Sequence, residues 1–167
     1  MTETQTYSEY IASLPRVLSG AAVLFRDAGG RVLIAETTYR EDGRWTLPGG
    51  TVESDSGESP RQGARRETLE EIGLDVEPGR LLAVDWVRGP GRPPAVAYLY
   101  DGGVLDEARQ AAIVLQAEEL SQWRMVTPAE AEGYVSDNLY RRIRAALTAL
   151  EHGARTAELE DGYPVGS

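Results

Sequence analysis

The segment from Ser59 to Gly73 constrains the fold more than any other part of the chain, because it carries signals for both ends of a helix. Ser59 can accept a hydrogen bond as the N-cap, Pro60 suits the first turn, and Gln62 completes a capping box. Gly73 stands where the left-handed residue that follows a helix is favoured. The sequence therefore predicts a helix over residues 59–72.

This helix carries an acidic stripe. At about 100° per residue, Glu67, Glu70 and Glu71 fall within an arc of roughly 100°. Small and apolar residues occupy the neighbouring arc and can pack on a sheet: Ala64, Thr68, Leu69 and Ile72. Carboxylates at i, i+3 and i+4 repel one another, and a hard cation such as Mg²⁺ removes that cost because it prefers oxygen ligands. Alone, such a stripe is more often a solvated helix face.

The remaining segments predict an α/β (α+β) domain with a mixed β-sheet between helices. Expected helices lie at 8–14, at 128–132 as a helical turn, and at 138–152, where the apolar residues follow one side. Expected strands lie at 16–25, 31–36, 74–87, 95–100 and 121–126, the first two joined as a hairpin by the turn 27–30. We divide the chain into an N-terminal arm or short helix (1–15), one domain (16–153) and a polar tail (154–167), loose or packed on a partner.

The composition narrows the class of partner. The 167 residues carry a formal net charge of −10 and no cysteine, which excludes disulfides, thiolate zinc sites and cysteine nucleophiles. An acidic surface repels long nucleic acid and anionic membranes, and it repels a small phosphorylated substrate unless a cation intervenes. There is no long apolar run and no secretion signal, so we expect no membrane span and a cytoplasmic protein.

The surroundings of the acidic stripe resemble a known family. The run Arg66-Glu67-Thr68-Leu69-Glu70-Glu71-Ile72-Gly73-Leu74 resembles the core of the Nudix box, and Trp45-Thr46-Leu47-Pro48-Gly49-Gly50 resembles its W-x-L-P-G-G lead-in. Two features depart from the pattern: Gly50 and Glu58 are separated by seven residues where the family has five, and Thr68 occupies an aliphatic position. The resemblance implies a Nudix-type α/β/α sandwich whose box forms a catalytic loop-helix-loop.

The resemblance also implies the site. Glu67 and Glu71 would be ligands of Mg²⁺, with Mn²⁺ as a substitute, and Glu70 would be a third ligand directly or through water. The backbone carbonyl of Gly49 would be another ligand. Arg66 would orient the glutamates, and Glu58 would brace the loop.

The general base is not fixed in Nudix enzymes, and four glutamates are candidates: Glu67, Glu70, Glu118 and Glu119. The pair before the strand at 121–126 occupies a region that often supplies a late acidic residue in the family, and we take Glu119 as the catalytic candidate from it. The single histidine, His152, stands at a helix end, where its charge would be favourable without being catalytic.

The substrate is less constrained than the metal. Arg44, Trp45 and Arg88 are the candidate substrate contacts, because arginine pairs with phosphates and aromatic faces stack on bases. Arg40 and Arg92 are further cations beside the box. Pro90-Gly91 lies about as far after the box as a proline that marks ADP-ribose-type Nudix enzymes, although Arg92-Pro93-Pro94 follows in place of the acidic residue expected there. We expect a Mg²⁺-dependent pyrophosphohydrolase acting on a nucleoside diphosphate linked to another moiety, such as a nucleotide sugar or ADP-ribose.

Two alternatives stay open: a hydrolase of nucleoside triphosphates or oxidised nucleotides, and a non-catalytic nucleotide-sensing module. We also expect a homodimer to which the arm or the tail contributes.

Overall fold

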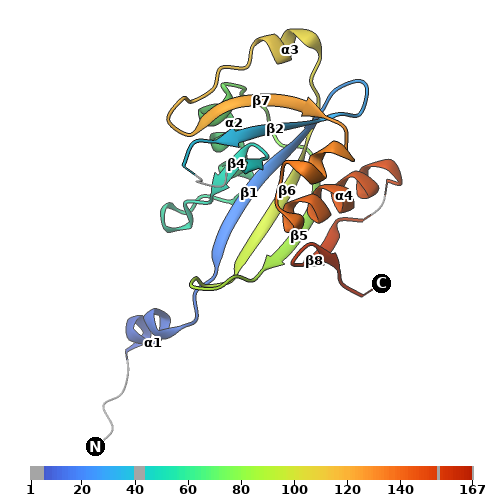
Figure 1. The fold of residues 1–167 in the computed structure, drawn as a ribbon. Helices are drawn as coiled ribbons and strands as arrows, with labels where there is room; N and C mark the ends of the chain where they lie inside the picture. Colours follow the sequence, from blue (N-terminus) through green and yellow to red (C-terminus); the bar gives the residue numbers. More distant parts are fainter. Residues whose placement is uncertain (1–5, 40–43, 154, 167) are drawn as a thin grey trace, which may run out of the picture.

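The computed structural model describes residues 6–39, 44–153 and 155–166. The helices are α1 (Tyr7–Ser13), α2 (Pro60–Ile72), α3 (Glu107–Ala111) and α4 (Asp137–Glu151), with 3₁₀ turns at Ser54–Ser56 and Glu130–Gly133. The strands are β1 (Leu18–Arg26), β2 (Val32–Thr37), β3 (Trp45–Thr46), β4 (Gly49–Thr51), β5 (Leu81–Val87), β6 (Ala95–Val104), β7 (Leu120–Val126), β8 (Ala157–Glu160) and β9 (Tyr163–Pro164). Figure 1 shows their arrangement.

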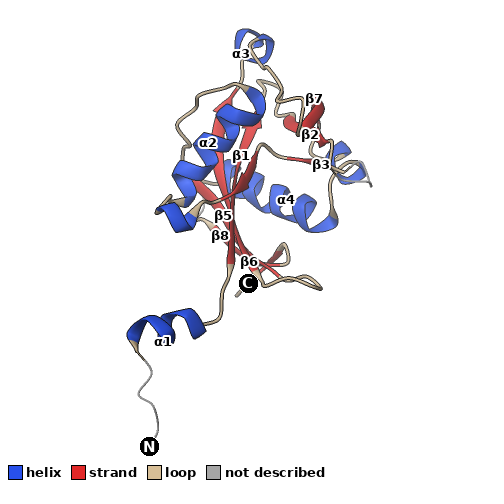
Figure 2. Cartoon of the chain, turned by 90° about the vertical axis from the view of Figure 1, so that its left-hand side faces the viewer, coloured by secondary structure: helices blue, strands red, loops and turns tan. Residues whose placement is uncertain are grey.

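The strands form one mixed, open sheet in the order β3-β2-β1-β6-β5-β8-β9, with β4 paired to β1 and β7 paired to β2. The pairs β1–β6 and β5–β8 are parallel, and the other pairs are antiparallel. Helices α2 and α4 lie on opposite sides of the sheet (Figure 2). The expected class, a mixed sheet sandwiched between helices, is confirmed.

Two hydrophobic cores form, one on each face of the sheet. On one face α4 buries Ile143, Ala146 and neighbours against Leu82 and Leu99. On the other face α2 buries Ala64 and Ile72 against the alternate side chains of β1. This division follows from the two-residue period of a strand, which sends successive side chains of β1 to opposite faces.

Helix α2 begins and ends where the sequence predicts. Ser59 accepts a hydrogen bond from the backbone N–H of Gln62, and the Gln62 side chain accepts one from the Ser59 N–H. Gly73 has a φ of 73°, the left-handed geometry that ends a helix. Thr68 is fully buried, and its hydroxyl donates to the Ala64 carbonyl, so the departure at this position is absorbed locally. Leu69 instead remains 46% exposed, which differs from its expected packing position.

The segment 74–80 is a loop, whereas we expected a strand over 74–87. Asp75 and Glu77 form ion pairs with Arg65 of α2, and the Gly79 N–H donates to the Asp101 carbonyl. These contacts attach the loop to α2 and to β6, so that strand pairing begins only at Leu81. The short helix α3 was not predicted from the sequence.

The expected hairpin of β1 and β2 is paired only beside its turn, at Arg26 and Val32. Beyond that point β2 pairs with β7, and β1 pairs with β4 at Gly20, Ala21 and Ala22. This divergence brings β4, and with it Gly49 and Gly50, alongside the central strand of the sheet.

The two ends of the chain behave differently. The segment we separated as a polar tail adds β8 to the sheet, beside β5, and buries Leu159 to 1% exposure. Helix α1 has no buried residue and stands away from the body of the molecule (Figures 1 and 2). No helix among the described residues combines the length and apolar character that crossing a membrane requires.

Candidate active site

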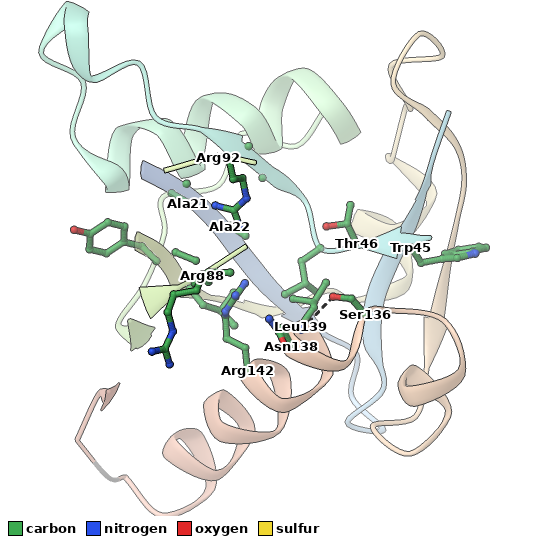
Figure 3. Close-up of a pocket in the computed structure, with 18 residues that line it drawn as sticks. Ala21, Ala22, Trp45, Thr46, Arg88, Arg92, Ser136, Asn138, Leu139 and Arg142 are labelled. Carbon is green, nitrogen blue, oxygen red and sulfur yellow. Dashed lines mark hydrogen bonds between the residues drawn. The ribbon is translucent and has the colours of Figure 1, made fainter. Parts of the chain in front are cut away.

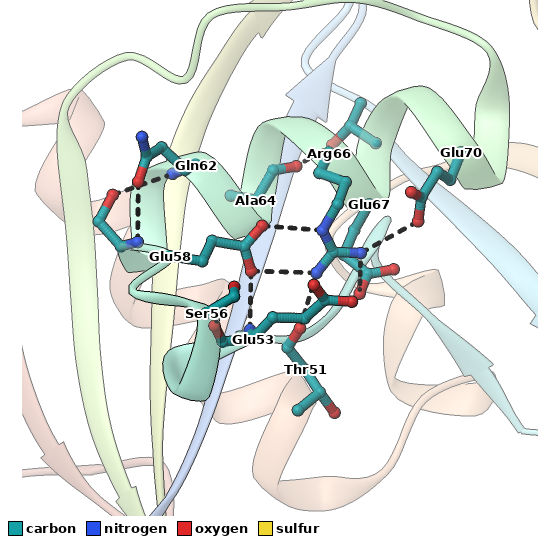
Figure 4. Close-up of polar contacts among 11 residues, drawn as sticks. Thr51, Glu53, Ser56, Glu58, Gln62, Ala64, Arg66, Glu67 and Glu70 are labelled. Atoms are coloured by element: carbon teal, nitrogen blue, oxygen red, sulfur yellow. Dashed lines mark hydrogen bonds and ion pairs between the residues drawn. The ribbon is translucent and has the colours of Figure 1, made fainter.

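Arg66 is the centre of the polar cluster on α2 (Figure 4). Its guanidinium donates to both carboxylate oxygens of Glu58 at 2.8 and 3.1 Å, and its Nη1 lies 3.0 Å from oxygens of Glu67 and of Glu70. Its Nη2 also donates to the Thr51 carbonyl at 3.0 Å. One cation therefore joins the helix to the preceding loop. The predicted orienting role of Arg66 and bracing role of Glu58 are consistent with these contacts.

The box loop, which is two residues longer than the family pattern, contains a 3₁₀ turn over Ser54–Ser56. Gly57, with a φ of 82°, ends that turn, and the Glu53 N–H donates to Glu58 at 2.7 Å. Hydrogen bonds from Arg66 and Glu53, with the charge of Arg66, hold the pKa of Glu58 below its usual value. The insertion therefore leaves Glu58 against Arg66.

Glu71 is the most buried carboxylate of the stripe, at 4% exposure. One of its oxygens accepts a hydrogen bond from the Gly49 N–H at 2.8 Å. Burial, together with the charges of Glu67, Glu119 and Glu70, raises the pKa of Glu71 to about 8 against the opposing Gly49 hydrogen bond. Burial likewise raises the pKa of Glu67, although Arg66 opposes the shift. This part of the site is short of positive charge.

Gly49 and Gly50 lie against the helix and the sheet because neither has a side chain. A Cβ on Gly50 would lie 2.6 Å from the carboxyl group of Glu67. A Cβ on Gly49 would lie 2.3 Å from the Ala21 carbonyl oxygen, and its φ of 148° disfavours any other residue. The glycine pair thus allows the backbone to approach both Glu67 and Glu71.

Glu119 reaches the same cluster through its loop. The Val114 and Gln116 N–H groups each donate at 3.0 Å to carbonyls at the end of α2, those of Ile72 and Glu71. This attachment brings the charge of Glu119 close enough to raise the pKa of Glu67 and Glu71. Glu118, by contrast, is exposed, and its carbonyl accepts a hydrogen bond from the Thr38 hydroxyl.

A cavity of about 380 Å³ adjoins Gly49 and Gly50 on the α4 side of the sheet (Figure 3). Its walls come from β1, β3, β4, β6 and the start of α4, together with the segment after β5. Three arginines line it, Arg88, Arg92 and Arg142, and none of its described lining residues is acidic. The cavity is therefore a basic recess in an acidic protein.

The three candidate substrate residues lie in different surroundings. The indole of Trp45 is buried against Tyr134 and under the Arg124 guanidinium, so it offers no open face for stacking, although Trp45 borders the cavity. Arg88 lines the cavity and is held by Asp161 at 2.9 Å. Arg44 is exposed, and its carbonyl accepts from Thr37. Arg40 lies outside the described residues.

Arg142 and Asn138 of α4 line the cavity and were missed by sequence reasoning, which treated 138–152 only as an amphipathic helix. A signal was present in the sequence: Asp85 is a lone charge inside the apolar run 81–87. A charge in a buried strand needs a partner, and Asp85, fully buried, pairs with Arg142 at 2.7 Å.

The family model for the NUDIX domain matches residues 16–148 of the chain. The chain belongs to the Nudix family. It is 32% identical over 133 residues to an RNA pyrophosphohydrolase of Dinoroseobacter shibae, a match that covers 71% of this chain and 81% of that protein. Membership makes the protein a hydrolase that acts on acid anhydrides, as expected from the box.

Solved Nudix structures share the fold at lower identity. A UDP-X diphosphatase matches with a TM-score of 0.70 and 17% identity over 93% of this chain and 76% of that one. The NUDIX domain of Shewanella oneidensis NrtR, crystallised with ADP ribose, matches with a TM-score of 0.68 and 18% identity over 87% and 99%. A C. elegans Ap4A hydrolase matches with a TM-score of 0.63 and 21% identity over 82% and 99%.

Nudix hydrolases generally use a divalent metal, and the donors here suit one. Glu67, Glu70 and Glu71 offer only oxygen atoms, and the raised pKa values of Glu67 and Glu71 indicate a deficit of positive charge that a cation would relieve. In the described part of the chain no three acidic or histidine side chains converge as a ready-made metal group. Glu67 and Glu70 contact Arg66 instead, and Glu71 contacts Gly49.

Proposed function

We propose that the protein is a Mg²⁺-dependent pyrophosphohydrolase that cleaves a phosphoanhydride bond in a nucleoside diphosphate linked to another moiety. The observation that carries this proposal is the cavity of about 380 Å³ that continues from Gly49 and Gly50 along the α4 side of the sheet. A phosphate group at the carboxylates does not need this recess. A substrate with a bulky organic part beside its diphosphate does, and cavities of this size accommodate small organic ligands.

The proposed metal ligands are Glu67, Glu70, Glu71 and the Gly49 carbonyl. A bound Mg²⁺ would supply charge neutralisation of the diphosphate and activation of the attacking water. Arg66 holds Glu67 and Glu70 in place through hydrogen bonds of 3.0 Å.

We assign the general base to Glu119, whose charge acts on Glu67 and Glu71 and whose loop is attached to the end of α2. Its carboxylate would accept the proton as the water oxygen bonds to phosphorus and the bond to the departing phosphate breaks. The assignment of Glu119 over Glu118 rests on the exposure of Glu118 and on the effect of the Glu119 charge on Glu67 and Glu71.

A second candidate substrate class is a 5′-triphosphate end, including that of RNA. It is favoured by the 32% identity to the Dinoroseobacter shibae RNA pyrophosphohydrolase. The net charge of −10 favours a short 5′ end over a long nucleic-acid surface.

Hydrolysis with Mg²⁺ of ADP-ribose, UDP-glucose, diadenosine polyphosphates, nucleoside triphosphates and a 5′-triphosphorylated oligonucleotide would test these classes. The products, separated by ion-exchange chromatography, identify the bond that is cleaved. When the reaction is run in ¹⁸O-water, the product that carries ¹⁸O identifies the phosphorus that is attacked. We expect a nucleoside monophosphate and a second phosphorylated product from the linked compounds. Pyrophosphate release from the triphosphates alone would favour the second class. Binding without turnover of any compound would make the protein a sensing module.

We also propose a homodimer formed through the N-terminal arm, residues 1–15. Helix α1 exposes Tyr7, Tyr10 and Ile11 along one side, followed by Leu14, at the spacing of an apolar helix stripe. Each of these four side chains is at least 40% exposed. A second copy of the chain would remove this apolar surface from water.

A further inference from the structure

Arg92 and Arg142 reach into the cavity from two different walls (Figure 3). Arg142 belongs to α4, which covers the opposite face of the sheet from α2 and its carboxylates. Arg92 belongs to the loop between β5 and β6. None of the described residues that line this cavity is acidic, so an anion bound between the two guanidinium groups would meet donors and no facing carboxylate.

The guanidinium of Arg142 is held in place by an ion pair with Asp85. Its Nε and one terminal nitrogen lie 2.8 and 2.7 Å from the same oxygen of Asp85, which is fully buried in β5. Among the described residues, none accepts a hydrogen bond from the other terminal nitrogen of Arg142, Nη1. Because this nitrogen is not among the buried atoms that lack a partner, it is accessible from the cavity. The ion pair therefore orients a donor that is left available to a ligand in the cavity.

The C-terminal segment holds this arrangement together. The Gly162 N–H donates to the second oxygen of Asp85 at 3.0 Å. Its neighbour Asp161 accepts hydrogen bonds from the Arg88 backbone at 2.8 Å and from the Arg88 side chain at 2.9 Å. Asp161 and Gly162 both have positive φ, 51° and 82°, in the turn between β8 and β9. That turn thus positions both the partner of Arg142 and the side chain of Arg88 at the cavity rim.

Arg92 has fewer contacts. Its guanidinium lies along Gly89, where a Cβ would be 3.3 Å from Nε and from Nη2, and its Nη1 donates to the Pro93 carbonyl at 3.1 Å. Among the described residues no side chain pairs with it. It can therefore turn toward an anion without breaking an ion pair.

We propose that Arg92 and Arg142 form a subsite for a second phosphate of the substrate, a phosphate monoester separate from the diphosphate at the carboxylates. This inference rests on the proposed function, since it names the class of linked nucleotide that the cavity takes. Arg88, oriented by Asp161, lies at the rim of the subsite. Arginine suits the role because charge-assisted hydrogen bonds to phosphate are the strong ones and can be bidentate.

The test compares ligands that differ by one phosphate monoester. Calorimetry on the full-length protein in EDTA, where metal-dependent turnover is suppressed, gives dissociation constants for NADP⁺ against NAD⁺ and for coenzyme A against 3′-dephospho-coenzyme A. We expect the phosphorylated member of at least one pair to bind about 10-fold tighter or more, the effect of one or two charge-assisted hydrogen bonds. Equal constants within both pairs, or no binding of either phosphorylated member, would overturn the proposal.

Three variants locate the effect. Arg92→Ala should reduce the preference to less than about 3-fold, because it removes one of the two cations facing the phosphate. Arg142→Gln combined with Asp85→Asn should do the same without leaving a lone buried charge. Arg109→Ala, on the exposed helix α3, makes the same charge change as Arg92→Ala and should keep the preference.

A preference retained in Arg92→Ala would overturn the proposal even if the double variant does not fold. A phosphate preference in calorimetry together with no hydrolysis of the screened compounds, of NADP⁺ or of coenzyme A would contradict the proposed function and leave the subsite standing. Hydrolysis without a preference for the phosphorylated ligand would support the proposed function and contradict the subsite.

Discussion

Replacing Glu71 by glutamine is expected to remove most of the activity and to stabilise the metal-free protein. Burial raises the pKa of Glu71 to about 8 from an ordinary value of 4.5. Because the pKa is higher in the folded state, the folded protein keeps the proton between these two pH values while the unfolded chain has lost it. The stability contributed by this group is therefore fully present below pH 4.5 and is lost as the pH rises through 8.

The size of the effect follows from the difference between the two pKa values. Each unit corresponds to about 1.4 kcal/mol, so ionised Glu71 costs the metal-free fold at most about 4–5 kcal/mol above pH 8. Glutamine has no charge, and its amide oxygen can still accept the hydrogen bond that the Gly49 N–H donates at 2.8 Å. We expect Glu71→Gln to be more stable than the wild type by about 3 kcal/mol at pH 8, and nearly equal to it at pH 4.5.

Urea unfolding in EDTA at both pH values measures the stability, and hydrolysis with Mg²⁺ measures the activity. Activity should fall by about 100-fold or more, because a neutral amide replaces a charged metal ligand. Glu132→Gln, an exposed change of the same kind, should alter neither quantity. Wild-type turnover in Glu71→Gln would refute the metal assignment. A variant less stable than the wild type at pH 8 would refute the attribution of strain to the Glu71 charge.

Three further changes test other parts of the site. Glu119→Gln should lower kcat by about 100-fold with little change in KM, as expected for loss of a general base. The same change at Glu118 should have little effect on kcat. Equal losses of kcat in both variants would contradict the assignment. Gly50→Ala should lower activity by about 10-fold or more, since its Cβ would lie 2.6 Å from the Glu67 carboxyl. The control Gly133→Ala, whose Cβ meets nothing within 4 Å, should retain activity. A larger loss of activity in Gly133→Ala than in Gly50→Ala would count against the close approach of Gly50 to Glu67. Removal of the N-terminal arm should convert a dimer to a monomer by light scattering at micromolar concentration, and a wild-type monomer would rule out the arm-mediated dimer.

Local chemistry made helix α2 predictable. The caps at Ser59 and Gly73 act within a few residues of themselves, so the ends of α2 could be derived without knowing any long-range contact. The contacts of Arg66 with Glu67 and Glu70 are also local to the helix, whereas its contacts with Glu58 and Thr51 depend on how the preceding loop folds. The box spacing then identified the family.

Other features depended on partners far away in the sequence. The strand expected from residue 74 begins only at Leu81, because Arg65 attracts Asp75 and Glu77 into a loop. The sequence is equally compatible with Trp45 as a base-stacking residue or as a core residue. Its contact with Tyr134 shows that the indole packs in the core. Nothing local distinguishes these outcomes, since each depends on what tertiary packing places beside the residue.

The sequence by itself determined the helix, its acidic stripe and the oxygen-donor chemistry, because caps, helical period and charge spacing are short-range properties. Only the tertiary structure decided what surrounds those carboxylates. It buried Glu71 against the Gly49 N–H, and it brought Glu119 to the end of α2. It also placed Arg142 in the cavity through Asp85, 57 residues away, and through a C-terminal turn at Gly162. Burial and long-range pairing set the pKa values and the shape of the pocket, and both arise only when distant segments pack together.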